Sequence, residues 1–177
     1  TIVILAGGMG RDLQRRGAQF RQPAWSALAL SEGPQAVAAV HAASVATGAN
    51  VITSNSYAVV PFHIGEERFA AEGQALAALA GELAQRAVQA SGKSVRIAGS
   101  LPPLFGSYRP DLFDACRANA LLAPLVTGLA PHVDLWLAET QSSTVEARAI
   151  HAGLPKDGKP FWLSFTLKDE DTDEVPR

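Results

Sequence analysis

Short apolar runs rich in β-branched residues recur along the chain and constrain its fold more than any other feature. None of them alternates between apolar and polar residues, as a strand with one solvent-facing side would. Continuous apolar character is expected when both faces of a parallel strand are covered. The sequence therefore predicts five strands, over residues 2–5, 50–53, 94–98, 133–138 and 161–165.

Helical patterns separate these runs. The sequence predicts four helices, over residues 34–47, 66–90, 111–130 and 142–153. Pro34 suits a first helical turn, and Gly48 is placed to end that helix. Pro124 removes a backbone donor and is expected to kink or split the third helix. Ser142 is the predicted N-cap of the fourth.

Strands and helices that alternate in this way form right-handed βαβ crossovers around a parallel sheet. The predicted fold class is therefore α/β. The periodicity leaves two architectures open, an open doubly wound sheet and a sheet curled into a barrel.

Charge and composition exclude several classes of protein. The formal net charge is −2 and the basic residues are scattered, which argues against a nucleic-acid binder and favours a small polar or zwitterionic ligand. No stretch approaches the roughly 18 apolar residues of a membrane span. Cys116 is the single cysteine, so no internal disulfide can form. We expect a cytoplasmic protein.

The sequence holds no ligand spacing typical of a metal site. Its four histidines are far apart, and Cys116 falls on a predicted helix, where we expect a small core residue. Residues 168–177 contain five acidic and two basic side chains. We expect this segment to be an acidic solvated tail or loop after a body of residues 1–167.

Small and polar residues follow the predicted strands. Gly7 and Gly8 follow the first and a Ser-Asn-Ser-Tyr segment the second, while Glu139 and Thr140 follow the fourth. The carboxyl ends of parallel strands form the ligand-binding face of α/β folds, so a site is expected there. A carboxylate at the end of an apolar strand needs a cation or several donors. Arg109 or Arg11 could supply the cation for Glu139, or this carboxylate could be solvated at the rim.

The turn after the first strand has two interpretations. Glycines at positions 7, 8 and 10 could cradle a phosphate, but Leu13 stands where a dinucleotide fingerprint needs another glycine. A tight turn is the better interpretation.

Several motifs in one order resemble the homocysteine S-methyltransferase family. They are ILAGGMG (4–10), Leu13, Arg16-Gly17, Trp25-Ser26, GANVITSNSY (48–57), AGSLPP (98–103), Glu139-Thr140 and WLSF (162–165). The resemblance implies a (β/α)8 TIM barrel, of which this chain would supply about five strands and four helices. It also implies methyl transfer to the homocysteine thiol from a sulfonium, betaine or similar donor, giving methionine.

The family resemblance also implies a set of binding residues. Residues expected to contact the substrate are Glu139, Thr140, Gly7, Gly8, Thr53, Asn55 and Ala6. Ala6 occupies the position at which the family usually has an aspartate that helps to hold the amino group of homocysteine. Loss of this aspartate is expected to weaken substrate binding.

Zinc is expected in the complete family domain, where three cysteines hold it. These cysteines follow later strands and are absent from this chain, which resembles the N-terminal part of the domain. We therefore expect the isolated chain to be inactive, and to need a dimer or a complementing C-terminal segment to cover its open edges. The alternative is a non-catalytic half-barrel, a binding or assembly module derived from the family.

Overall fold

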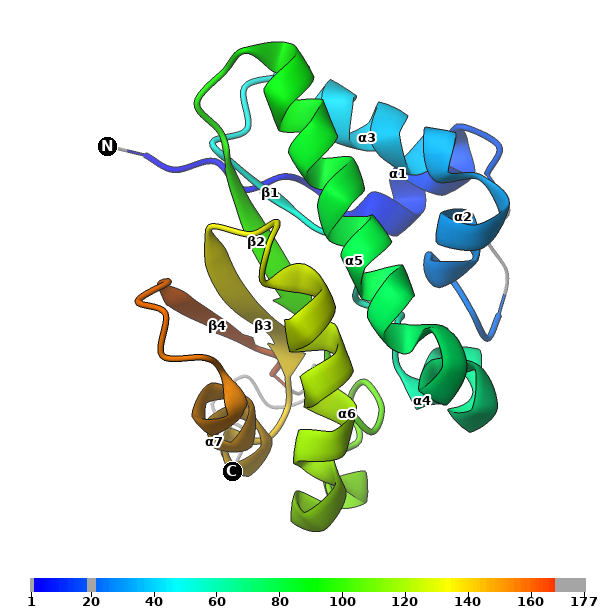
Figure 1. The fold of residues 1–177 in the computed structure, drawn as a ribbon, viewed down its shortest axis with the longest axis vertical. Helices are drawn as coiled ribbons and strands as arrows, with labels where there is room; N and C mark the ends of the chain where they lie inside the picture. Colours follow the sequence, from blue (N-terminus) through cyan, green and yellow to red (C-terminus); the bar gives the residue numbers. More distant parts are fainter. Residues whose placement is uncertain (1, 19–21, 168–177) are drawn as a thin grey trace.

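A computed structural model describes residues 2–18 and 22–167 of the chain. Its centre is one parallel sheet in which the strands lie side by side in chain order (Figure 1). The strands are β1 (Val51–Thr53), β2 (Arg96–Leu101), β3 (Leu135–Gln141) and β4 (Phe161–Phe165). They confirm four of the five predicted strands, and the acidic segment 168–177 lies outside the described residues.

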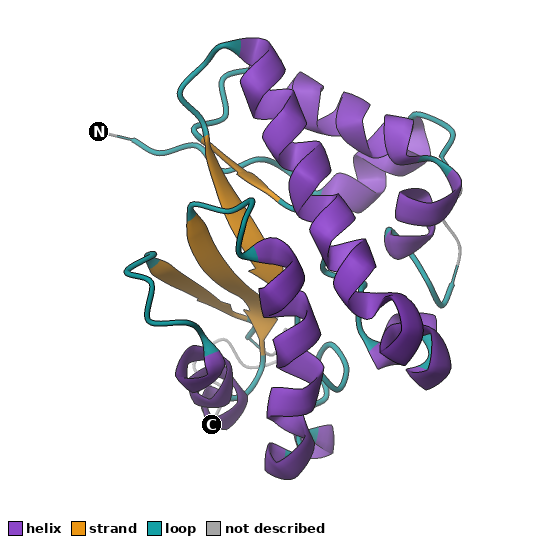
Figure 2. Cartoon of the chain, viewed as in Figure 1, coloured by secondary structure: helices purple, strands orange, loops and turns teal. Residues whose placement is uncertain are grey.

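Strand order decides between the two architectures that periodicity left open. A doubly wound sheet reverses its strand order and carries helices on both faces. Here the order β1-β2-β3-β4 has no reversal. Figure 2 shows the long helices together on one side of the sheet. Both features are those of a barrel in which each strand is followed by an outer helix.

The long helices lie close to their predicted positions. They are α3 (Pro34–Ala46), α5 (Glu66–Ser91), α6 (Ala115–Leu129) and α7 (Thr144–Gly153). Pro124 lies inside α6 and does not split it, and a separate 3-10 helix, η1 (Pro110–Leu112), precedes α6. The N-cap of α7 is Ser143 and not Ser142, because the Ser143 side chain accepts a hydrogen bond from the Glu146 amide.

Three short helices were not predicted. They are α1 (Met9–Arg15), α2 (Ala27–Glu32) and α4 (Pro61–Ile64). Each has seven residues or fewer, so its periodic pattern is too short to stand out from a loop. Two of them, α1 and α2, precede α3, and α4 lies between β1 and α5.

The predicted first strand is wrong as a full strand. Within residues 2–5 only Leu5 forms a bridge, to Val51. The amides of Asn50 and Val51 both donate to the carbonyl of Ile4. The Ile4 amide donates to the side-chain oxygen of Asn50 at 2.9 Å. Because these hydrogen bonds share one carbonyl and involve a side chain, they interrupt the regular hydrogen-bond ladder between residues 2–5 and β1. Ile2 is 87% exposed, so no packing fixes the run as a strand.

Each face of the sheet packs against a different apolar cluster. Ile52, Ile97 and Trp136 lie in the large core under the helices. Val51, Ala98, Leu135 and Leu137 form a second cluster with Trp162 packed against it. Because side chains alternate along a strand, these residues face away from the helices, as the interior of a barrel requires.

Helices α5 and α6 approach closely at a glycine. A Cβ atom added to Gly128 would lie 2.4 Å from the carbonyl oxygen of Gln74 on α5. Only glycine lets the two backbones pack at this distance, so Gly128 is required for the close packing of α6 on α5.

Apolar side chains remain exposed along β4, the last strand in the described sheet. Leu163 is 40% exposed and Phe165 is 37% exposed. Nothing in the described chain pairs with the outer edge of β4. Within the same residues, no helix combines the length and apolar character that crossing a membrane requires.

Candidate functional site

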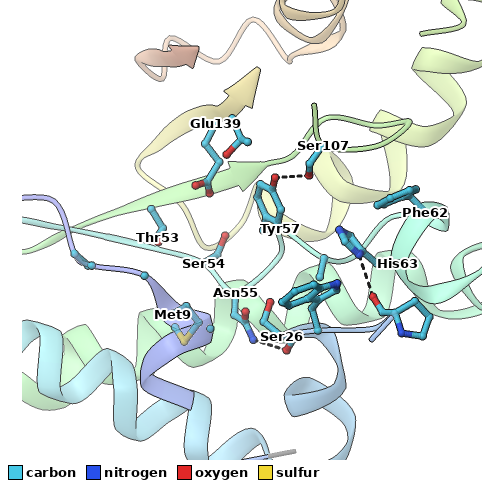
Figure 3. A pocket seen from close by; sticks show the side chains of 18 of the residues that line it. Met9, Ser26, Thr53, Ser54, Asn55, Tyr57, Phe62, His63, Ser107 and Glu139 are labelled. Atoms are coloured by element: carbon cyan, nitrogen blue, oxygen red, sulfur yellow. Dashed lines mark hydrogen bonds between the residues drawn. The ribbon is translucent and has the colours of Figure 1, made fainter. Parts of the chain in front are cut away.

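A cavity of about 900 Å³ opens at the carboxyl ends of the strands (Figure 3). All seven residues predicted to contact a substrate line it: Ala6, Gly7, Gly8, Thr53, Asn55, Glu139 and Thr140. They come from three separate parts of the chain that the parallel sheet brings together. Their roles toward a ligand stay predictions.

The floor of this cavity continues the inner face of the sheet. Alternation along β3 puts Glu139 on the same side as Leu135 and Leu137, and Thr53 follows Val51 in the same way on β1. The polar residues therefore begin where the apolar interior cluster ends. A ligand in the cavity would meet polar groups at the strand ends and an apolar layer beneath them.

Three buried serines join the ends of β1 and β2. The Ser100 amide donates to Ser54 Oγ at 3.0 Å, and Ser56 Oγ donates to the Ser100 carbonyl at 2.7 Å. The hydroxyls of Ser54 and Ser56 are 2.9 Å apart. Buried and fully paired networks of this kind rigidify their surroundings. They fix the backbone from which the Ser100 hydroxyl reaches Glu139.

Glu139 is the charged centre of the site. Ser100 Oγ donates a hydrogen bond to its carboxylate. Burial raises the pKa of Glu139 above its ordinary value, and the Ser100 hydrogen bond opposes that rise only in part. A carboxylate that is desolvated in this way gains strongly from a cation placed beside it.

Neither arginine that the sequence offered as a partner reaches Glu139. Arg109 forms a two-pronged pair with Asp111, at 2.8 Å and 2.7 Å. Arg11 is exposed on α1, and neither arginine lines the cavity. Glu139 is half-buried where it lines the cavity, and burial raises its pKa, which argues against a fully solvated carboxylate at the rim. Among the described residues, no lysine or arginine lines the cavity with Glu139.

We expect the stability of the ligand-free protein to fall as the pH rises through the pKa of Glu139. The folded-state pKa is above the unfolded value of about 4.5, so the native state holds its proton more tightly. The contribution of Glu139 to the free energy of unfolding is fully present below pH 4.5 and is lost as the pH rises through the raised pKa. Glu139→Gln keeps an oxygen for Ser100 and removes the titration. In thermal melts it should be more stable than the parent at pH 7.5, and the difference should shrink toward pH 4.5.

The control for this experiment is Glu82→Gln, which removes a surface carboxylate on α5 that pairs with Arg86. Exposed ion pairs contribute little to stability, so the melting temperature of this variant should vary with pH as that of the parent does. A Glu139→Gln profile that runs parallel to the parent profile at every pH would contradict a raised pKa for Glu139.

Backbone strain is concentrated around the same cavity. In the described chain, the non-glycine residues with positive φ are Trp25 (45°), Tyr108 (63°) and Thr140 (59°). All three line the cavity. Positive φ is unusual for any of these residues and is a clear outlier for β-branched Thr140. Such conformations persist where surrounding structure enforces them, typically at functional sites.

Aromatic side chains form one part of the cavity wall. The Tyr57 hydroxyl is 2.6 Å from Ser107 Oγ. Burial raises the pKa of Tyr57, so the phenol keeps its proton at neutral pH. Phe62, His63 and Tyr108 extend this wall. Four of the lining residues were not predicted from the sequence, because they lie on α4 and in a loop without a periodic signal: Phe62, His63, Ser107 and Tyr108.

Asn55 has a structural hydrogen bond in addition to its predicted role. Its side-chain amide donates to the Ser26 carbonyl at 3.0 Å, and Asn55 is buried. This bond holds the segment that precedes α2 against the end of β1. Asn55 thus shapes the cavity whether or not it touches a ligand.

The donor groups for a metal do not converge in the described residues. Cys116 is exposed on α6 and does not line the cavity, so its predicted place in the core is wrong. His41 is buried, and His132 contacts Gln85 at 3.0 Å. No group of three potential ligands occurs in the parts of the chain that the structure covers.

Comparisons with known proteins agree on one family. A family model described as homocysteine S-methyltransferase matches residues 3–176. A selenocysteine methyltransferase of Astragalus bisulcatus is 30% identical, over 94% of this chain and 59% of that protein. The homocysteine S-methyltransferase of Escherichia coli (strain K12) is 29% identical, over 96% of this chain and 60% of that protein.

Solved structures give the same result. The crystal structure of an Escherichia coli homocysteine methyltransferase in its oxidized form matches with a TM-score of 0.83 and 29% identity. The match covers 99% of this chain and 66% of that one. The metallated form matches with a TM-score of 0.81. These neighbours are TIM barrels, so the described sheet is part of such a barrel.

The chain spans about three-fifths of the length of the curated relatives that it matches. The family match, which extends over nearly the whole chain, agrees with the motif order and with the singly wound sheet. The chain belongs to the homocysteine S-methyltransferase family and corresponds to its N-terminal part.

Proposed function

We propose that this chain forms the homocysteine-binding part of a methyltransferase that makes methionine. One observation carries the proposal, namely the half-buried Glu139 carboxylate, which lines the cavity, accepts a hydrogen bond from Ser100 and has no arginine partner among the described residues. The ammonium group of an amino acid is a cation of suitable size for this place. Its binding would relieve the desolvation that raises the pKa of Glu139.

The remaining predicted residues suit the polar end of an amino acid. Thr53 and Thr140 bring hydroxyl groups to the cavity from the ends of β1 and β3. The Thr140 amide donates to Ser164 Oγ at 3.2 Å, which anchors its strained backbone to β4. Gly7 and Gly8 add no side chain at the mouth and leave room for the ligand.

The proposed reaction transfers a methyl group to sulfur. The methyl carbon forms a bond with the homocysteine sulfur, and its bond to the sulfonium sulfur or ammonium nitrogen of the donor breaks. The electron pair of that bond stays on the donor, which leaves as a thioether or an amine. The thiol proton of homocysteine is released. The product, methionine, places the activity in methionine biosynthesis.

Zinc is expected only with the part of the domain that this chain does not include. Zinc sites take three or four converging nitrogen, sulfur or oxygen ligands. The one exposed cysteine and the dispersed histidines described above do not fit that requirement. We therefore assign no step to a metal held by this chain, and we keep zinc as an expectation for the complete domain.

The unpaired edges of the described sheet suggest what kind of partner the chain has. The outer edge of β4 and the exposed residues 2–5 are the positions at which further strands would close a barrel. A complementing C-terminal segment fits the two-fifths of the relatives' length that the chain does not match. A dimer of the chain is the other way to cover these edges. We propose a cytoplasmic location for the assembled enzyme.

The test compares the chain alone with the chain joined to a segment that completes the barrel. Calorimetry should detect L-homocysteine binding in both forms. Metal analysis should find no stoichiometric zinc in the chain alone and about one zinc in the completed barrel. Methionine should form from homocysteine and a methyl donor only in the completed barrel.

Two results would count against the proposal. Tightly held zinc in the chain alone would show that its residues form a metal site after all. Absence of homocysteine binding in both forms would favour the alternative, a non-catalytic half-barrel that serves binding or assembly.

A further inference from the structure

The side chain of His63 is held in one orientation at the edge of the cavity. It lies on α4, is 8% exposed and lines the cavity. Its Nδ1 atom is 3.0 Å from the carbonyl oxygen of Pro23. A carbonyl oxygen can only accept a hydrogen bond, so Nδ1 carries the proton and donates it. Figure 3 shows this contact beside Phe62.

The second ring nitrogen of His63 is therefore a hydrogen-bond acceptor. Nε2 has no hydrogen-bond partner among residues 2–18 and 22–167, and it is not one of the fully buried unpaired atoms. Burial lowers the pKa of His63, which keeps the imidazole neutral at neutral pH. A neutral ring with Nδ1 protonated has a free lone pair on Nε2. Because His63 lines the cavity, a ligand bound there can reach this lone pair.

Two aromatic rings lie beside the His63 ring. Phe62 meets His63 edge to face at a centroid distance of 4.9 Å, and the Tyr57 ring is 6.3 Å away. Faces of aromatic rings attract cations. A lone pair on a ring that has aromatic neighbours therefore suits a cationic group that still carries an N–H bond, such as a protonated amine.

His63 and Glu139 belong to different ends of one cavity. Tyr57 contacts the His63 ring and also lies within electrostatic reach of Glu139, so it stands between them (Figure 3). A cavity of about 900 Å³ has room for two small molecules at once. If homocysteine takes the Glu139 end, the second substrate occupies the His63 end.

We propose that His63 is a specificity-determining residue whose Nε2 accepts a hydrogen bond from a protonated amine of the methyl donor. This inference rests on the proposed function, since it assumes homocysteine at Glu139. His63 selects donors that keep an N–H bond, such as an amino acid with a sulfonium group, over fully methylated amines. It acts on binding of the donor and not on the transferred methyl group.

The unmodified chain provides the first test. N,N-dimethylglycine and betaine differ by one methyl group, and only the former has an N–H bond. With the chain saturated with homocysteine, calorimetry should show that N,N-dimethylglycine binds at least about tenfold more tightly, the effect of one hydrogen bond to a charged group. Equal binding, or tighter binding of betaine, overturns the proposal.

Two variants provide the second test. Asparagine in His63→Asn can keep the bond to Pro23 and lacks the Nε2 atom, whereas glutamine in His63→Gln can place an oxygen near the Nε2 position. His63→Asn should weaken binding of S-methylmethionine by about tenfold and leave betaine unchanged, and His63→Gln should restore much of the loss. Equal losses for both ligands in His63→Asn would mean that His63 only shapes the cavity.

A separate titration keeps the two proposals distinguishable. Homocysteine alone should bind the parent and both His63 variants with similar affinity. If homocysteine fails to bind the parent, the proposed function fails. If homocysteine binds and the donors do not respond to His63, only the present inference fails. Should a variant not fold, the comparison of the two amines in the parent still decides.

Discussion

Replacing Glu139 by alanine should weaken homocysteine binding by about 1.5 to 3 kcal/mol, roughly a tenfold to more than hundredfold loss of affinity. The carboxylate is held by Ser100 at the end of β3 and is desolvated before the ligand arrives. An ammonium group therefore gains a charge-assisted hydrogen bond with little further loss of water. Calorimetry with L-homocysteine at pH 7.5 measures the effect directly.

The control for Glu139→Ala is Asp111→Ala. Asp111 is an exposed carboxylate that pairs with Arg109, and it does not line the cavity. Its removal should leave homocysteine affinity unchanged. The variant Glu139→Gln separates charge from shape, because it retains a hydrogen-bonding oxygen and should still lose most of the affinity. An unaltered dissociation constant in Glu139→Ala would remove Glu139 from the substrate site.

Introducing the missing carboxylate at position 6 should have the opposite effect. Ala6 lines the same cavity as Glu139, and its amide is fixed by the Val51 carbonyl at 2.9 Å. Family resemblance places an aspartate here as the second partner of the substrate ammonium. Ala6→Asp should tighten homocysteine binding by roughly tenfold to a hundredfold, the value of one more charge-assisted hydrogen bond.

The same substitution should lower the stability of the ligand-free form. A second carboxylate near Glu139 adds like-charge repulsion when no ammonium is present. The melting temperature should therefore fall slightly at pH 7.5 and recover when homocysteine is added. Ala6→Asn is the matched control, since it has the shape of aspartate without the charge. Equal homocysteine affinities in Ala6 and Ala6→Asp would favour the non-catalytic half-barrel.

Much of the fold was predictable because its signals are local. Continuous apolar runs predicted the four strands of the sheet, and leucine spacing predicted α5 to within one residue at its end. The cluster at the strand ends was predictable for a geometric reason. Parallel strands bring their carboxyl ends to one edge, so residues as distant as Gly8, Thr53 and Glu139 had to approach one another.

Other features depend on long-range contacts that leave no periodic signal. Residues 2–5 have the composition of a strand. However, the Ile4 amide donates to the Asn50 side chain and not to a neighbouring strand, which interrupts the ladder. The partner of Glu139 is Ser100 and not an arginine, because pairing of β2 with β3 places the serine beside it. No sequence pattern distinguishes these outcomes from the alternatives.

The sequence by itself determined the alternation of strands and helices, the family, and the edge of the sheet where polar residues gather. Tertiary structure alone decided that Glu139 lies half-buried beside Ser100, and that His63 turns Nδ1 to Pro23 at the edge of the cavity. The physical reason is the range of the interactions. Periodicity and motif order can be recognised from residues that are close in the sequence. Desolvation and hydrogen-bond partners depend on segments that come into contact only after folding.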